Sequence, residues 1–216
     1  MMNQTATLLI LCYTKIKDSA IVIHTLSRDF GRCSFLVSVS KSTPMAMFLP
    51  LNIVEADIVH NSRSTLARAR NFSTKHPLNG IRNNYTKNSI SLFISEVLFR
   101  SVTEGAYEEG LFDWCVVSVL TLDALQEGVA NFHLRWLLEF CGELGFAPSA
   151  EDLLPFAGNQ AAAIKALAEL PRSEALLLPL NGKDRSSIAA AVLKYISHHS
   201  GQALEVKSLR VLGELF

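Results

Sequence analysis

The spacing of hydrophobic residues changes along the chain, from a period of two to a period between three and four. Every second residue from Cys33 to Val39 is apolar and most residues between them are polar, as in a strand with one buried face. After residue 88, apolar residues recur at positions 90, 93, 94, 97 and 98, which is the spacing of an amphipathic helix. The pattern therefore predicts a β-rich N-terminal part followed by a helical part.

Five short strands are predicted before residue 73. Gly31 ends the turn 27–31 and can adopt the positive φ that such a turn requires. The fifth strand places Arg68 and Arg70 on one face, opposite the small apolar residues between them. Five strands in about 70 residues are typical of a small OB-type barrel, whose outer face and loops often bind single-stranded nucleic acid. The predicted strands are Leu8–Tyr13, Ala20–Leu26, 32–40, Leu51–Val59 and Thr65–Phe72, with a further turn at 61–64.

The helices follow a break near residues 77–88, where Pro77 and Gly80 interrupt the apolar spacing. Helices are predicted around 90–98, 111–122, 132–144 and 160–170, then from a cap at Asp184 or Ser186 to Gly201, and finally around 209–215. We therefore expect an α+β protein. Its N-terminal domain, residues 1–80, is predicted to be a five-stranded OB-type β-barrel that binds DNA. Its C-terminal domain, residues 81–216, is predicted to be α-helical and to bind protein partners.

The charge distribution supports two modules with different partners. Residues 1–87 carry eleven Lys and Arg against four Asp and Glu, a net charge of +7, and residues 88–216 carry −7. A basic surface suits a polyanion, whereas the acidic half is poorly suited to one. The chain is 49% hydrophobic and 19% charged, which is typical of a globular protein. No apolar run approaches the roughly 20 residues that span a bilayer, so we expect a cytoplasmic protein without membrane contact.

The DNA-binding candidates are basic residues that flank turns or share a strand face. Aromatic side chains among them could stack on bases, and Tyr13 and Phe30 are better placed for this than Phe35, which shares a face with core valines. Phe72 and Tyr85 are further aromatic candidates. The predicted DNA-binding residues are Lys15, Lys17, Arg28, Arg32, Arg68 and Arg70.

No motif for catalysis, a cofactor or a metal is found in the sequence. Gly182 and Lys183 are followed by Asp184 and lack the upstream glycine of a phosphate-binding loop. The four cysteines are far apart and form no C-x-x-C pair, so they predict neither a zinc site nor a disulfide framework. His133 lies beside an apolar helix face and is more simply a buried structural residue. We therefore expect no enzyme activity, no cofactor and no metal.

Several segments resemble the RecO family of bacterial DNA repair proteins, in the form found in Bacteroidetes. The run YTKIKDSAIV at 13–22, with Thr25 and the Phe-Gly-Arg of 30–32, resembles the opening of that family. Four further segments resemble it in the same order, namely LFISEVLFR at 92–100, GVANFHL at 128–134, LGFAP at 144–148 and VKSLRVL at 206–212. The segment 150–183 is shorter than is usual in this group.

This resemblance implies a function as well as a fold. It implies an N-terminal OB domain, a helical C-terminal domain and a recombination mediator that is not an enzyme. Such a protein binds single- and double-stranded DNA, anneals complementary strands, and works with RecR and often RecF to load RecA onto DNA coated by single-strand-binding protein. Some members hold zinc with four cysteines in the helical domain, a pattern that this chain lacks.

The resemblance also suggests that the helical domain binds the C-terminal tail of single-strand-binding protein. A tail ending in an aromatic residue and a carboxylate needs an apolar pocket with a basic rim. Arg100 and Arg135 are the predicted partner-binding residues, with Lys165 and Lys194 as further candidates. The simpler alternative is that each pairs with a nearby acid, as Arg135 would with Glu139 four residues later.

Two other functions stay open on the sequence alone. An OB barrel can serve as a protein adaptor that binds no DNA. An enzyme whose catalytic groups meet only in space would also show no sequence motif. The charge difference between the two halves favours DNA binding over the adaptor.

Overall fold

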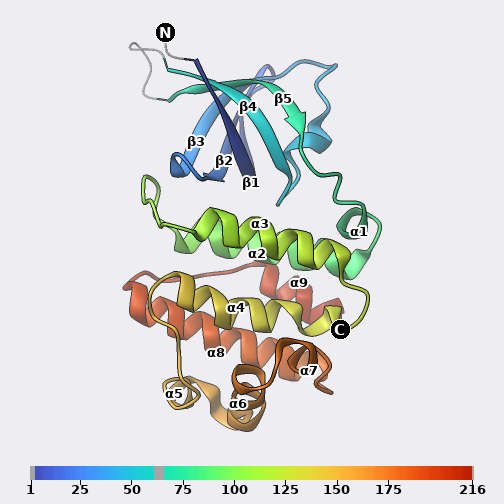
Figure 1. Ribbon diagram of the computed structural model, residues 1–216, viewed down its shortest axis with the longest axis vertical. Helices are drawn as coiled ribbons and strands as arrows, with labels where there is room; N and C mark the ends of the chain where they lie inside the picture. Colours follow the sequence, from blue (N-terminus) through green and yellow to red (C-terminus); the bar gives the residue numbers. More distant parts are fainter. Residues whose placement is uncertain (1–2, 61–65, 216) are drawn as a thin grey trace. The chain divides into compact units, whose positions relative to one another are not determined.

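The computed structural model describes residues 3–60 and 66–215, which form two compact units (Figure 1). The first unit contains the chain up to Leu78 together with Val102–Val119, and the second contains Asn79–Ser101 and the chain from Leu120 onward. The turn predicted at 61–64 and Thr65, the first residue of the predicted fifth strand, lie outside the described residues. The division into domains of residues 1–80 and 81–216 stays a prediction.

Five strands form a closed barrel in the order β1-β2-β3-β5-β4, which confirms the predicted OB-type barrel followed by helices (Figure 1). Neighbouring strands are antiparallel except β3 and β5, which run parallel. The strands are β1 (Asn3–Lys17), β2 (Ala20–Ser27), β3 (Gly31–Ser38), β4 (Ile53–Val59) and β5 (Arg68–Thr74).

Strand β1 is longer than predicted because it pairs with two different strands. Residues 3–9 pair with β4, and residues 8–17 pair with β2. The last part of β1 is polar and exposed, so it shows none of the apolar alternation that marks a strand in the sequence.

Alternate side chains from all five strands fill the barrel. Phe35 and Val37 are buried there, as their shared face predicts. Phe48, from the loop between β3 and β4, is also buried in this cluster. The complete buried cluster is Ala6, Leu8, Ile10, Ile21, Ile23, Phe35, Val37, Phe48, Val54, Ala56, Ile58 and Ala69.

A β-bulge interrupts the alternation of β5. Asp57 pairs with Arg70 and Glu55 pairs with Ser73, so two residues of β5 oppose one residue of β4. Asn71, the first of the two, has a φ of 56°, a left-handed conformation that Asn tolerates better than most residues. As a consequence Phe72 packs against the barrel core three residues after the inward-facing Ala69.

The turn after β2 brings residues 102–119 against the barrel. Gly31 has a φ of 61°, as its turn position predicts. The backbone N–H of Arg32 donates to the carbonyl of Ala106 at 3.2 Å, and the N–H of Gly105 donates to the carbonyl of Arg32 at 2.8 Å. A Cβ at Gly31 would lie 2.0 Å from the Ala106 carbonyl oxygen, so only glycine allows this approach.

The helices follow the predicted order, with short additional segments. The longest, α8, begins at Gly182, two residues before the first predicted cap, Asp184. Asn181 is its N-cap and forms a capping box with Asp184, and the helix ends before Gly201 at a φ of 67°. The helices are α1 (Asn79–Arg82), α2 (Tyr85–Ser101), α3 (Leu111–Ala124), α4 (Phe132–Glu143), α5 (Leu154–Ala157), α6 (Ala161–Glu169), α7 (Arg172–Leu176), α8 (Gly182–Ser200) and α9 (Ser208–Leu215).

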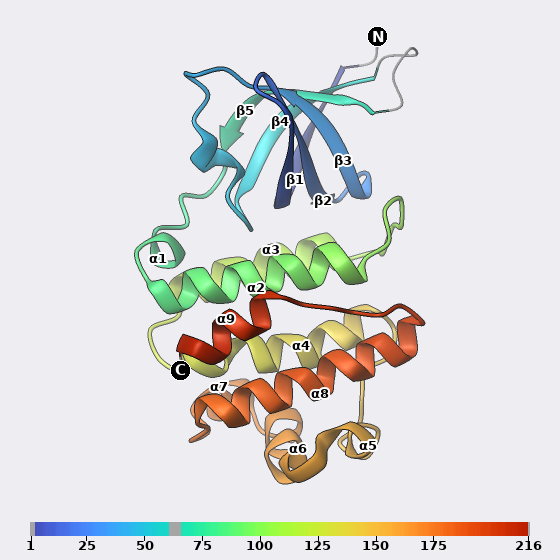
Figure 2. The ribbon, with the colours of Figure 1, turned by 180° about the vertical axis from the view of Figure 1, so that it is seen from behind.

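The second unit has its own core around α2, α4 and α8, and α9 packs against both α2 and α8 (Figure 2). The Trp136 and Phe140 rings stack with centroids 4.9 Å apart. His133 is buried, and its ring meets Phe93 edge-on at 5.6 Å. Burial, assisted by the charge of Arg185, lowers the pKa of His133 to about 3, so this histidine is a neutral part of the core.

We expect Gly31→Ala to destabilise the first unit more than Gly110→Ala. Gly110 also has a positive φ, of 83°, but among the described residues no atom beyond its own chain neighbours lies within 4 Å of the place that a Cβ would take there. Gly110→Ala therefore carries conformational strain alone, about 1–2 kcal/mol. Gly31→Ala adds a clash with a backbone carbonyl, and its melting temperature should be lower by several degrees. Calorimetry of both variants tests this, and equal melting temperatures would contradict it.

The buried His133 predicts a pH-dependent stability. An unfolded histidine takes up a proton near pH 6.5, whereas His133 stays neutral until about pH 3. The free energy of unfolding should therefore fall as the pH drops below about 6.5, by up to about 1.4 kcal/mol per unit from this residue. Urea denaturation at about pH 7 and about pH 5 should show a smaller pH effect in His133→Gln than in the wild type.

The exposed His76 provides the control, because its substitution by Gln should leave the wild-type pH effect intact. If His133→Gln and the wild type lose the same free energy between the two pH values, the assignment to His133 is wrong.

Candidate nucleic-acid interface

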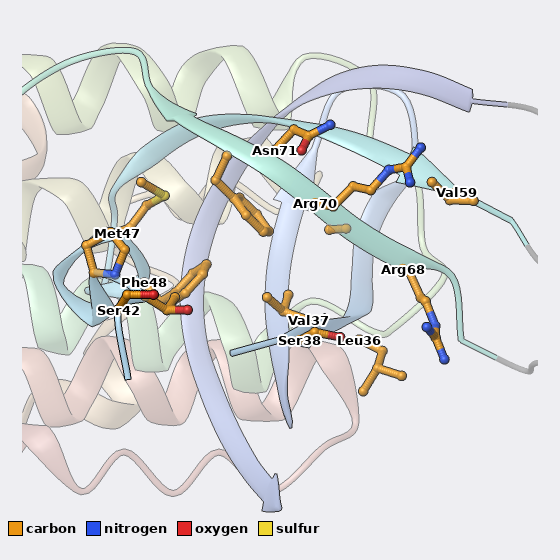
Figure 3. A pocket seen from close by; sticks show the side chains of 14 residues that line it. Leu36, Val37, Ser38, Ser42, Met47, Phe48, Val59, Arg68, Arg70 and Asn71 are labelled. Atoms are coloured by element: carbon orange, nitrogen blue, oxygen red, sulfur yellow. The ribbon is translucent and has the colours of Figure 1, made fainter. Parts of the chain in front are cut away.

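A groove opens on the barrel where β3 and β5 meet (Figure 3). Its volume is about 770 Å³, which is within the range of ligand pockets. Residues 36–38 of β3 form one wall, and residues 68–72 of β5 form the other. The loop between β3 and β4 contributes residues 42–44, 47 and 48, and β4 contributes Val59.

The groove exists because β3 and β5 pair over a short distance. Among the described residues, Leu36 and Arg68 are the one registered pair between them, and the Leu36 N–H donates to the Ala67 carbonyl at 3.0 Å. The bulge follows directly along β5. Below the opening, Phe48 and Phe72 meet edge-on with ring centroids 5.1 Å apart. The seam of the barrel therefore has an apolar floor.

Two arginines on β5 line the groove. Arg68 and Arg70 are exposed (Figure 3), and neither forms an ion pair within the described part of the chain. Asp57 lies opposite Arg70 on β4. It accepts hydrogen bonds from Asn71 Nδ2 at 2.7 Å and Thr5 Oγ1 at 3.1 Å. These bonds, more than the charge of Arg70, lower the pKa of Asp57.

Lys15 and Lys17 lie at the edge of the barrel that carries the groove. Lys15 of β1 pairs with Ile21 of β2, and Ile21 in turn pairs with Val37 of β3. In the same way, Lys17 lies two strands away from Ser38. Val37 and Ser38 both line the groove, so the lysine backbones lie about 10 Å from it, two strand spacings. Lys15 also forms an exposed ion pair of 2.8 Å with the carboxylate three residues later, a contact that contributes little energy.

Arg28 and Arg32 lie elsewhere, beside the turn at the opposite end of the β2–β3 hairpin. Arg28 Nε donates to Asp113 Oδ1 at 3.1 Å, and its guanidinium lies 5.8 Å from the Phe112 ring centroid. Arg32 is 5% exposed, and its Nη1 lies 3.2 Å from Glu104 Oε2. Both arginines therefore bind segment 102–119, and we leave them out of the candidate interface.

The charge difference between the chain's halves largely disappears in the fold. Segment 102–119 contributes four acidic residues to the first unit, which then has nine basic and eight acidic residues and a net charge of +1. The second unit has a net charge of −1. The case for a polyanion partner therefore rests on the local arrangement around the groove and not on the total charge of the barrel.

The aromatic candidates also divide by position. Phe35 belongs to the core, as predicted, and Phe30 is partly buried with its ring 6.0 Å from that of Phe35. Tyr13 remains 44% exposed on β1. The sequence pattern did not single out Met47, which lines the groove from the 3-10 helix Met45–Phe48. Its only signal is an apolar residue within a loop.

One cluster on the barrel contains the residue types of a serine hydrolase triad. His24 Nδ1 lies 2.9 Å from Ser34 Oγ, and its Nε2 lies 3.1 Å from Thr14 Oγ1. Glu104 accepts a hydrogen bond from the Ser34 hydroxyl, so the serine lies between the acid and the imidazole. This hydrogen bond, with the charge of Arg32, lowers the pKa of Glu104. In a catalytic triad the acid orients the histidine, so this cluster is an anchor for segment 102–119.

The two main partner-binding candidates of the helical part, Arg100 and Arg135, are engaged in ion pairs. Arg100 Nε donates to Glu96 at 2.8 Å. Arg135 Nε donates to Glu139 at 2.9 Å, which confirms the simpler alternative for this residue. Arg135 also donates to the carbonyl of Leu167 at 2.6 Å, so it joins α4 to the end of α6.

Membrane-spanning helices and metal sites are both missing from the described residues, 3–60 and 66–215. No helix there is both long and apolar enough to cross a bilayer. No group of three or more His, Cys, Asp or Glu side chains in this part of the chain gathers into a potential metal site.

Comparison with known proteins identifies relatives along nearly the whole chain. Residues 82–153 match the family model described as Recombination protein O C terminal. The chain is 28% identical to the DNA repair protein RecO of Phocaeicola vulgatus, covering 92% of this chain and 93% of that protein. It is 27% identical to RecO of Flavobacterium psychrophilum over 94% of both chains. It is 26% identical to RecO of Bacteroides fragilis over 96% of this chain and 97% of that protein.

These matches agree with the barrel, with the helices that follow it and with the segments quoted from the sequence. The family model covers the start of the helical part, and the full-length relatives extend the match to the barrel. The chain is therefore similar to DNA repair proteins of the RecO family along nearly its whole length.

Proposed function

We propose that this protein acts in DNA repair as a recombination mediator that binds DNA at the groove edge of its barrel. In this proposal it anneals complementary strands and, with RecR and RecF, helps to load RecA; bond cleavage plays no part. The observation that carries the DNA-binding step is the pair of exposed arginines, Arg68 and Arg70, beside an open groove and near Lys15 and Lys17. The names of the relatives support the repair role.

The four cations suit a phosphate backbone because they are exposed. Lysines and arginines that neutralise phosphates release counterions, so affinity falls as salt rises, with a log–log slope of about −0.7 per phosphate on single strands. Such contacts carry no sequence information. Binding through this surface should therefore depend strongly on salt and weakly on sequence, which suits a protein that anneals strands of any sequence.

Replacing Arg68 and Arg70 together by Glu should weaken DNA binding at least tenfold for every sequence. The loss of two phosphate contacts should also flatten the salt slope by about 1.4. Fluorescence anisotropy with labelled single strands across a salt series measures both quantities. Both arginines are exposed, so circular dichroism should be unchanged.

The matched control is a double variant with the same change in net charge, made at two positions away from the groove. Lys165 and Arg210 are exposed residues of α6 and α9, and their joint replacement by Glu should leave DNA affinity and slope unchanged. Equal losses in both double variants would show a general effect of charge and remove β5 from the interface. If the wild type binds DNA with an affinity that does not depend on salt, or binds no DNA at all, the function of a protein adaptor would be favoured.

We also propose that the helical part binds the C-terminal tail of single-strand-binding protein. Arg135 is occupied by three backbone carbonyls and Glu139, so its loss should lower stability rather than tail affinity alone. Arg100 is 34% exposed and remains the better rim candidate. Arg100→Ala should reduce binding of a tail peptide severalfold at an unchanged melting temperature. If Arg100→Ala binds the tail peptide with unchanged affinity, the tail binds at another site.

A further inference from the structure

Helix α9 packs against α2 and α8 of the second unit (Figure 2). At its start, the N–H and the hydroxyl of Ser208 donate to Glu96 Oε2 at 2.8 and 2.7 Å. Leu212 is 2% exposed, whereas the other residues from 208 to 214 are partly or fully exposed. An isolated helix of about eight residues is marginal in water, so α9 depends on these contacts for its conformation.

The segment that connects α8 to α9 adds little to this attachment. Residues 201–207 form neither a helix nor a strand, and five of these seven residues are exposed. Segments with few buried apolar contacts open more readily than the core of a domain. Helices α2 and α8 also contact α4, so α9 can leave them as a unit while they stay folded.

The surface of α2 and α8 that α9 covers, the α9-binding site, has a specific chemistry. Burial alone would raise the pKa of Glu96, but the hydrogen bonds from Ser208 and the N–H of Lys207 lower it, so the carboxylate is ionised. A carboxylate stabilises the start of a helix, where N–H groups are unpaired. The α9-binding site therefore suits a helix that begins with donors and continues with an apolar residue.

We propose that two copies of this chain exchange α9, so that each α9 occupies the α9-binding site of the other copy. Exchange of an identical element reproduces the contacts of the single chain, so the bonds to Glu96 and the burial of Leu212 are retained. An acidic peptide would instead bring like charge to Glu96. This inference goes beyond the proposed DNA binding and does not depend on it.

An exposed apolar strip beside α9 gives the two copies a further surface at which to meet. Helix α9 runs back toward the α1 end of α2 (Figure 2), and Ser208 lies beside Glu96. Val211 is therefore next to Leu92, and both are 42% exposed. Tyr85, two turns before Leu92 on the same face of α2, is 71% exposed. Exposed apolar strips of this kind mark interaction surfaces.

The exchange should depend on protein concentration. A short connection holds α9 near its own binding site at an effective concentration in the millimolar range. The single chain should therefore dominate in dilute solution, and the exchanged dimer should increase as the protein is concentrated.

A disulfide between α8 and α9 can report which copy provides α9. A Cβ at Gly213 would lie 3.9 Å from the Cβ of Ser186, close to the usual separation in a disulfide. One variant carries Ser186→Cys and the other carries Gly213→Cys. The two are unfolded in urea, mixed, refolded at about 0.5 mM and oxidised. Non-reducing electrophoresis and peptide mass spectrometry then measure the dimer joined at positions 186 and 213.

This dimer should be at least tenfold more abundant than the dimer from Ser186→Cys mixed with Arg210→Cys, the matched control. Arg210 is also on α9, but its side chain is 88% exposed. Cys12 and Cys33 are partly exposed, so the wild type is oxidised in parallel to measure the background. The yield should fall when the same mixture is refolded at a tenth of the concentration.

A variant with Ser186→Cys and Gly213→Cys in one chain provides the converse test. Oxidised in dilute solution, it should close the bond within the chain and stay monomeric in sedimentation at about 0.5 mM. The wild type should form dimers at that concentration.

The inference is wrong if the wild type is monomeric there, or if the mixed variants give no more dimer than the Arg210→Cys control. A dimer that persists when α9 is bonded within its own chain would also contradict it, because such a dimer needs no exchange. None of these results would affect the proposed DNA binding, which is measured separately on the barrel.

Discussion

The barrel closes only because β5 pairs with two strands in different ways. It runs antiparallel to β4 over most of its length and meets β3 in parallel at Leu36 and Arg68. Closure removes the exposed strand edges at which sheets associate. The parallel contact is brief, however, and the bulge at Asn71 then turns the strand. The apolar side chains beneath this seam, Met47 and Phe72, consequently stay partly open, and the groove follows directly from the closure.

The positions of the carboxylates decide which basic residues remain available. Arg28 and Arg32 face Asp113 and Glu104, which residues 102–119 bring against the β2–β3 turn. The close approach at Gly31 makes this arrangement possible. Asp57 is the acid opposite Arg70, but its oxygens accept hydrogen bonds from neighbouring side chains. Whether an arginine in this barrel has a structural role or is available to bind a ligand therefore depends on its nearest acidic residue, and not on the net charge of the barrel.

The sequence predicts the period change, the five strands and most of the helices because these depend on local spacing. Phe35 and Gly31 were placed correctly for the same reason. Contacts between distant segments were not predictable. Nothing near Arg32 in the sequence indicates Glu104, seventy-two residues later. The bulge at Asn71 interrupts the alternation of β5, so the position of Phe72 could not be predicted from that alternation. The end of β1 is polar and forms a strand because it pairs with β2, which its own sequence does not indicate.

The floor and the edge of the groove would contribute to DNA binding in physically different ways. Attraction between the arginines and phosphates weakens as salt rises, because the release of counterions on binding then gains less free energy. Stacking of a base on an apolar floor depends much less on ionic strength. In such a mode the edge would govern encounter with any nucleic acid, and the floor would discriminate by whether a base is free. Because Lys15 and Lys17 lie outside the groove, a duplex could still engage the edge without entering it. One surface of the barrel would then serve both forms of DNA with different affinity, which an annealing protein requires as its substrate changes from single strands to duplex.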